Sequence, residues 1–273
     1  MAQHKRFLTG RTATAAALLA ALALAAVPAA SAPPLRTLKR VVNRAEAAHP
    51  NALWHIVHGL CLRDVQASGN PAPCAKVDLA GRYAVIKDIE RKTQYLLLPT
   101  DHITGIESPA LLEPGSPNYW LQAWRSRGLM EKQLGRPIPR DDIGLAINSV
   151  TGRTQDQLHI HIDCVKPDVR RALAAASPGL GRHWTRLNFG PRFDLYRARW
   201  LPDGDLATTD PFKLLARTDA AARADMGRET LALIPTTRPD GVQGFVLLAD
   251  RTDDDHDAAA EELLDHKCQV LSE

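Results

Sequence analysis

The most constraining feature of this sequence is a run over residues 157–164 in which polar and apolar side chains alternate strictly. Successive side chains of a strand point to opposite faces, so the run predicts a strand with one polar and one apolar face. The polar face carries Gln157, His159, His161 and Asp163, and the other face carries Leu158, Ile160, Ile162 and Cys164. We expect the apolar face to pack on the core. Two imidazoles then lie roughly 7 Å apart on the opposite face, a separation of two strand rises.

The segment before this strand, residues 149–156, is predicted to be a polar turn. It offers Gly152, hydroxyl groups, Arg153 and Gln155. Free backbone donors beside one cation suit a phosphate group. Imidazole is the side chain best able to act as a nucleophile or proton carrier near neutral pH. The turn and the strand together therefore predict a site for phosphate chemistry.

Periodicity and turn residues predict a mixture of helices and strands along the rest of the chain. Helices are expected over 51–62, 118–134, 169–176, 211–222 and 258–271, and strands over 82–86, 94–98, 143–148, 158–165, 193–198 and 244–248. The order lacks βαβ regularity, so the predicted class is α+β, with a mainly antiparallel sheet and flanking helices. The similar phrases "AVIKD" and "VLLAD" suggest a degenerate second half.

Charge and composition disfavour a nucleic-acid partner. Residues 1–32 carry Lys5, Arg6 and Arg11 and no acidic residue, so these three account for the whole excess of 34 basic over 31 acidic side chains. The remaining chain has no surplus of positive charge for a phosphate backbone, and aromatic residues make up only 5%.

The N-terminal 32 residues are typical of an export segment. A short basic head precedes an uncharged, Ala- and Leu-rich stretch over residues 12–35, and small residues stand before Ala32. We expect either a cleaved signal peptide or an N-terminal membrane anchor, followed by a catalytic domain over 33–273. The motif region of that domain is about 81–171, and an α+β part follows over about 179–273. Export would place this domain in the periplasm, at the inner membrane if the anchor is kept.

Export also places the four cysteines in an oxidising compartment. Four cysteines permit three pairings. We prefer Cys61 with Cys74, which closes a local polar loop, and Cys164 with Cys268, which ties the middle of the chain to its end. The sequence contains no Cys-x-x-Cys pair, the spacing that is typical of a structural zinc site.

The segment 157–164 resembles the histidine-triad motif of nucleotide hydrolases and transferases, with Gln157 in the first histidine position. Upstream, "AVIKDI" and "QYLLLPTDHI" resemble the first strand pair of those proteins. This resemblance implies that Asp88 binds ribose, and it places Gln94 where those proteins often carry another histidine.

A longer run, from "NALWHIVHGLC" to "LAINSVTGRTQDQLHIHIDCVKPDVR", resembles the bacterial CDP-diacylglycerol pyrophosphatase family. This resemblance implies hydrolysis of CDP-diacylglycerol to CMP and phosphatidate at a membrane surface. It implies that His159 forms a covalent cytidylyl intermediate and that His161 binds the phosphate or the leaving oxygen. No cofactor is expected, and the oligomeric state is left open. The implied substrate-binding residues are Asp88, Asn148, Arg153, Thr154, Gln155 and Gln157.

Three other functions fit parts of the pattern, one of them a non-catalytic nucleotide- or lipid-binding protein. His159, His161 and Asp163 form a His-x-His-x-Asp sequence that suits a metal-dependent hydrolase. A histidine-triad hydrolase or transferase of soluble nucleotides is the second alternative, although an export segment disfavours it.

Overall fold

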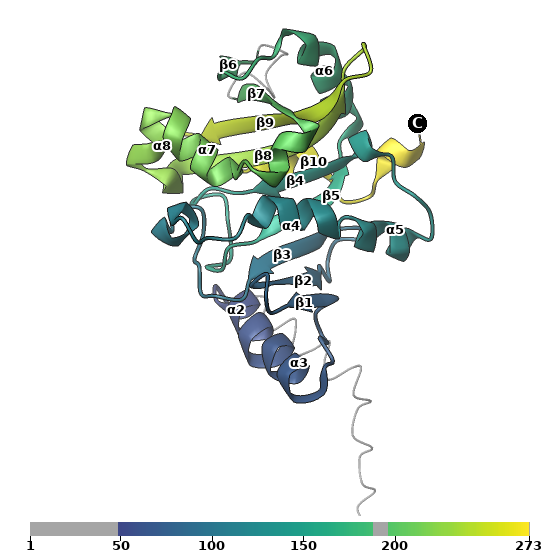
Figure 1. The fold of residues 1–273 in the computed structure, drawn as a ribbon, viewed down its shortest axis with the longest axis vertical. Helices are drawn as coiled ribbons and strands as arrows, with labels where there is room; N and C mark the ends of the chain where they lie inside the picture. The colour runs from purple at the N-terminus through teal and green to yellow at the C-terminus, as the bar shows by residue number, and fades with distance from the viewer. Residues whose placement is uncertain (1–48, 188–195, 273) are drawn as a thin grey trace, which may run out of the picture. The chain divides into compact units, whose positions relative to one another are not determined.

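The computed structural model describes residues 49–187 and 196–272. Ten strands form one sheet in the order β1-β2-β3-β5-β4-β8-β9-β7-β6, and β10 pairs with β5 beyond the end of β3 (Figure 1). Every pairing is antiparallel, which confirms the predicted α+β class with an antiparallel sheet. The strands are β1 (Lys76–Asp78), β2 (Tyr83–Lys87), β3 (Tyr95–Pro99), β4 (Ile143–Ile147), β5 (Ile160–Val165), β6 (Thr185–Arg186), β7 (Arg197–Pro202), β8 (Glu229–Thr237), β9 (Gln243–Arg251) and β10 (Leu264–Asp265).

Helices cover both faces of this sheet. They are α2 (Ala52–Ile56), which continues through a π-helical stretch (Val57–Leu62) into α3 (Arg63–Ser68), and then α4 (Tyr119–Ser126), α5 (Gly128–Leu134), α6 (Pro167–Ala176), α7 (Pro211–Thr218) and α8 (Ala220–Ala224). Short 3-10 helices lie at Pro109–Leu112, Arg140–Asp142, Ser177–Gly179, Asp203–Ala207, Met226–Arg228, Ala260–Leu263 and Gln269–Ser272.

One face of the sheet is buried along most of its width. Trp120 of α4, Met130 of α5 and Phe212 of α7 pack against it, and they share one core with Ile160 and Ile162 of β5. The apolar side of the alternating run is therefore the core side, as the sequence predicts. Burial of these large side chains supplies the main stabilisation of the domain.

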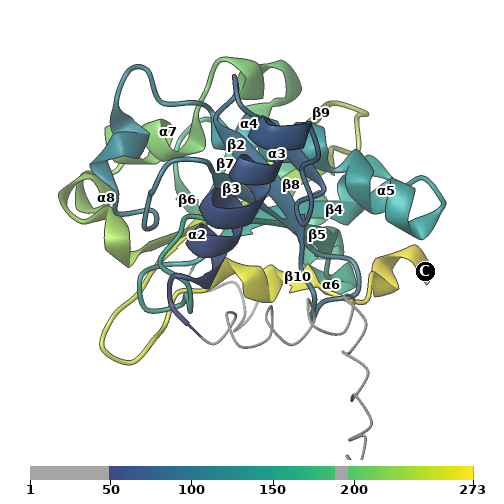
Figure 2. The ribbon, with the colours of Figure 1, turned by 90° about the horizontal axis from the view of Figure 1, so that it is seen from below.

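The opposite face has two separate covers. Helix α2 and the π-helical stretch lie over β2 and β3 at one end (Figure 2), where Ile56 and Val57 pack on Leu96 and Leu98. Helix α6 covers the strands beyond β4, where Val169 and Leu173 join a second core. The polar face of β5 lies between these two covers. This arrangement leaves the imidazoles open to a cavity instead of a core.

The strand order β2-β3-β5-β4 recurs in reverse as β8-β9-β7-β6. In the chain, helices lie between β3 and β4 in the first half and between β7 and β8 in the second. By this order, β9 is the counterpart of β5. Its residues Val246 and Leu248 lie in the core beneath α6. The second half therefore has apolar residues where the first half has histidines. Its origin by duplication stays a prediction.

The structure differs from the predicted elements in several places. The helix expected over 258–271 is wrong, because this segment forms two 3-10 helices flanking β10. Strand β8 was missed, because a central strand buried on both faces shows no alternation and this one contains Pro235. The strand expected over 193–198 is described only from residue 196, and β7 runs from Arg197 to Pro202.

Both expected disulfides are present. Cys61 is bonded to Cys74 and Cys164 to Cys268, the second across 104 residues of sequence. No helix within residues 49–187 and 196–272 is long and apolar enough to cross a bilayer. The export segment predicted over 1–32 lies outside the described residues and stays a prediction.

Candidate active site

A cavity of about 280 Å³ opens over the polar face of β5. Its walls come from helix α2, the turn after β2, the turn before β5, and the 3-10 helix Ala260–Leu263. It brings together Asp88, Asn148, Arg153, Thr154, Gln155, His159 and His161 with Glu261. Seven of the predicted site residues therefore converge in one place, and Gln157 does not line this cavity.

His159 is oriented as a nucleophile. Its side chain is buried, and Nδ1 lies 2.7 Å from the carbonyl oxygen of Gln157. A carbonyl oxygen can only accept, so Nδ1 carries the proton and the lone pair remains on Nε2. Burial lowers the pKa of His159 below its usual value, against the hydrogen bond to Gln157, and keeps the ring neutral.

His161 lies beside His159, with 4.9 Å between the ring centroids. The amide nitrogen of Gln94 lies 3.3 Å from Glu261 Oε1, which identifies it as the donor, and it also contacts His161 Nδ1. His161 then carries its proton on Nε2, a buried atom with no hydrogen-bond partner among the described residues. Burial lowers the pKa of His161 to about 3, so this ring is a neutral hydrogen-bond donor.

Glu261 is the carboxylate that contacts this pair. It comes from the Ala260–Leu263 helix, and its Oε1 lies 3.5 Å from His161 Nδ1. Asn148 holds it at both ends: its Nδ2 lies 3.3 Å from Glu261 Oε2, and its Oδ1 accepts from the Glu261 backbone N–H at 3.1 Å. Burial raises the pKa of Glu261, but His161 and the other neighbours reverse this and hold that pKa below the usual value. Asn148 therefore lines the cavity but uses its amide to position Glu261.

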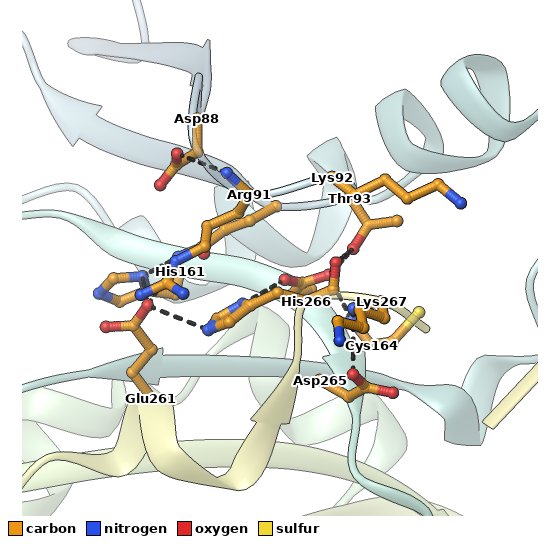
Figure 3. Close-up of polar contacts among 12 residues, drawn as sticks. Asp88, Arg91, Lys92, Thr93, His161, Cys164, Glu261, Asp265, His266 and Lys267 are labelled. Atoms are coloured by element: carbon orange, nitrogen blue, oxygen red, sulfur yellow. Dashed lines mark hydrogen bonds and ion pairs between the residues drawn. The ribbon is translucent and has the colours of Figure 1, made fainter. Parts of the chain in front are cut away.

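A second histidine follows behind Glu261 (Figure 3). His266 Nε2 lies 3.5 Å from Glu261 Oε1, and His266 Nδ1 lies 2.8 Å from Asp163 Oδ2. Asp163 is fully buried and also accepts from the Thr93 hydroxyl at 2.5 Å and from the Cys164 backbone N–H at 2.8 Å. Asp163 therefore orients His266, and it does not orient His159 or His161.

The turn before β5 forms one wall of the cavity. Gly152 packs closely there, since a Cβ on it would lie 2.6 Å from the carbonyl oxygen of Ala258. Thr154 is exposed, whereas Gln155 is buried and its Oε1 accepts from the backbone N–H of Leu53 at 3.2 Å. Arg153 lines the cavity. The turn therefore brings its glycine, hydroxyl and cation to the place expected for phosphate.

Arg153 is engaged by carboxylates. Both terminal nitrogens bond to Glu107, at 2.5 and 2.9 Å, and one also lies 3.2 Å from Asp156. Burial lowers the pKa of Arg153, but these partners more than offset that and raise it above the usual value. The guanidinium therefore ties the turn to Glu107 through paired hydrogen bonds.

The remaining predicted residues lie on either side of β3. Asp88 Oδ1 accepts from the backbone N–H groups of Glu90 and Arg91 at 2.8 and 3.1 Å, which fixes its carboxylate at the cavity edge. Gln157 is buried and donates to the carbonyl oxygens of Pro99 and Asp101 at 3.1 and 2.9 Å. It therefore joins the segment just before β5 to the end of β3.

The same geometry bears on the metal-site alternative. Asp163 does not line the cavity with the two imidazoles, and its oxygens are bonded to Thr93, Cys164 and His266. Within the described part of the chain, the one compact group of possible metal ligands is Asp163 with Cys164 and Cys268. Their sulfurs are joined in a disulfide. A joint His-His-Asp ligand set is therefore not assembled here.

An antiparallel α+β domain with two neutral imidazoles at a phosphate-compatible turn defines a phosphoryl-transfer type of site. A family model described as CDP-diacylglycerol pyrophosphatase matches residues 48–272. A CDP-diacylglycerol pyrophosphatase of Yersinia pestis is 43% identical over 233 residues, which is 85% of this chain and 89% of that protein. The chain belongs to the CDP-diacylglycerol pyrophosphatase family. A solved HIT family hydrolase from Clostridium thermocellum matches 40% of this chain and 92% of its own, with 19% identity and a TM-score of 0.29.

Sequence reasoning missed Glu261 and His266. Both lie in the segment that was predicted to be a continuous helix, and no local spacing connects them with the histidines of β5. Pairing of β10 with the end of β5 brings them there. The acidic pair at 261–262 was the available signal, but it is equally typical of a solvated turn.

Proposed function

We propose that this protein hydrolyses the pyrophosphate bond of CDP-diacylglycerol to CMP and phosphatidate through a cytidylyl intermediate on His159. The observation that carries the proposal is the hydrogen bond from His159 Nδ1 to the Gln157 carbonyl, at the wall of a cavity that Asp88 and the phosphate turn also line. Membership of the pyrophosphatase family supports the substrate.

In the first step, the lone pair on His159 Nε2 attacks the phosphorus next to cytidine. A P–N bond forms, and the bond to the bridging oxygen breaks, so that phosphatidate leaves with the electron pair. The Gln157 carbonyl stabilises the positive charge that develops on the ring, because it accepts a hydrogen bond from Nδ1–H. Phosphatidate is a phosphomonoester and a fairly good leaving group, so strong acid assistance is unnecessary.

His161 and the turn stabilise the charge that builds on phosphorus. The unpartnered Nε2–H of His161 donates to a phosphate or leaving oxygen. Thr154 and the backbone of the turn bind the non-bridging oxygens, and Gln155 ties the turn to Leu53 at the start of α2. The bonds of Arg153 to Glu107 hold the turn in place.

In the second step, water attacks the phosphorus, the P–N bond breaks, and its electrons return to His159 Nε2. CMP leaves, and Asp88 holds its ribose hydroxyls. A covalent route of this kind divides one difficult displacement into two easier ones.

The substrate and the disulfides also support a place outside the cytoplasm. Two disulfides among the described residues are typical of an oxidising compartment. A lipid substrate requires access to a membrane surface. We place the catalytic domain in the periplasm, near the inner membrane, brought there by the export segment at 1–32.

The test compares the wild type with His159→Ala and with a control, His58→Ala, an exposed histidine outside the cavity. CDP-diacylglycerol labelled in its cytidylyl phosphate is supplied with and without a chelator. We expect chelator-insensitive CMP release by the wild type and the control, acid-labile label on the protein, and neither in His159→Ala. Normal turnover by His159→Ala refutes the covalent role. Loss of activity with chelator indicates metal-dependent hydrolysis, and a preference for dinucleotides indicates a soluble-nucleotide enzyme.

A further inference from the structure

The second step needs a proton acceptor, because the attacking water loses a proton when it becomes an oxygen of CMP. Gln94 and Gln157 occupy positions where triad enzymes carry histidines, and an amide does not take up a proton near neutral pH. His161 is a poor base, because burial lowers its pKa to about 3. The acceptor must therefore be another group that lines the cavity.

Glu261 meets this requirement by its position. It lines the cavity that holds both imidazoles, and its side chain is 22% exposed. Hydrogen bonds from Gln94 and Asn148, each at 3.3 Å, hold one carboxylate oxygen each. A carboxylate fixed beside the reacting imidazoles is placed to accept a proton from a water in the same cavity.

The contacts behind Glu261 provide a route for that proton to leave. Asp163 accepts from His266 Nδ1 at 2.8 Å, which leaves the lone pair of His266 on Nε2. This Nε2 faces Glu261 Oε1 at 3.5 Å (Figure 3), and the His266 ring is 23% exposed. Glu261 and His266 therefore form a path from the cavity to the surface of the domain, and the buried Asp163 holds His266 in place.

We propose that Glu261 is the general base of the second step and that His266 carries the proton from it to solvent. This inference rests on the cytidylyl intermediate proposed above. Glu261 takes one proton from water as the oxygen bonds to phosphorus and the P–N bond to His159 breaks. The proton then passes to His266 Nε2 and to bulk water, which restores the carboxylate.

The alternative role for Glu261 is to position His161, which it contacts at 3.5 Å. The two roles differ in the step that they affect. A positioning residue affects release of phosphatidate and release of CMP together, because His161 binds the phosphate throughout. A general base affects only the release of CMP.

The experiment is a rapid-quench time course with Glu261→Gln and a matched control, Glu262→Gln, which changes an exposed carboxylate in the same 3-10 helix. In Glu261→Gln we expect a stoichiometric burst of phosphatidate at near the wild-type rate. Label should accumulate on His159, and CMP release should be slower by about 100-fold or more, the usual contribution of a general base. The control should match the wild type.

A second variant tests the chemistry without relying on the first. Glu261→Ala leaves space for a small carboxylate, so added formate should restore CMP release, whereas Glu261→Gln should not respond. His266→Gln should slow CMP release less than Glu261→Gln does and leave the burst intact.

Equal slowing of phosphatidate and CMP release in Glu261→Gln, or no slowing of either, overturns the proposal, as does failure of formate to rescue Glu261→Ala. Failure of the underlying function looks different: no label appears on the wild-type protein, and His159→Ala keeps its activity. The two failures are therefore distinguishable within one set of measurements.

Discussion

Acid should destabilise this protein through His161 by an amount that can be worked out from its environment. The ring is 5% exposed, and burial lowers its pKa from 6.5 to about 3. In the unfolded chain the ring takes up a proton at pH 5, whereas in the folded protein it stays neutral. The unfolded state therefore binds more protons, and stability falls as the pH drops below 6.5. Between pH 8 and pH 5 this group alone accounts for a loss of about 2 kcal/mol.

The assay is urea unfolding at both pH values for the wild type and His161→Gln, a non-titrating replacement. The wild type should lose about 2 kcal/mol more between pH 8 and pH 5 than the variant does, since the other titrating groups are common to both and cancel.

His256→Gln is a control of opposite sign. The hydrogen bond to Asp250 raises the pKa of His256, so its stabilisation is present at low pH and disappears as the pH rises through the folded pKa. The wild type should therefore gain on His256→Gln as the pH falls. Equal pH dependence of the wild type and His161→Gln would refute the argument that His161 is held neutral by burial.

Three further outcomes are expected. Replacing Cys164 and Cys268 together by Ser should lower the free energy of unfolding by about 2–5 kcal/mol in denaturant titrations, because the bond closes a long loop; an unchanged midpoint contradicts this. Gly152→Ala should lose about 1–3 kcal/mol and reduce kcat/KM through its contact at 2.6 Å with a backbone oxygen, whereas Gly115→Ala, with nothing within 4 Å, should do neither. Asp88→Asn should raise KM several-fold with little change in kcat, and the effect should shrink for a 2′-deoxyribose substrate; equal effects on both substrates contradict a ribose contact.

The alternating run at 157–164 determined much of the site without a structure. A period of two assigns each side chain to a face, so the histidines were separated from the core side before any contact was known. The structure confirms that Ile160 and Ile162 are buried in the core. The structure adds that the ring of His159 is hydrogen-bonded to a backbone carbonyl.

Longer-range features were predicted less completely. Periodicity identified β9 but missed its neighbour β8, which is buried on both faces and has no alternation to read. The segment from residue 258 onward has helix-forming residues, but strand pairing with β5 overrides that local preference.

The sequence by itself determined the polar strand, the turn before it and the phosphate chemistry that they suit, because these features depend on neighbours within a few residues. Only the tertiary structure decided that Glu261 and His266 complete the site and that Arg153 is bound by Glu107. These contacts join residues 46 to 167 positions apart. Local patterns specify which way a side chain faces, but only the pairing of β10 with β5 and the packing of the whole sheet select the distant segment that it meets.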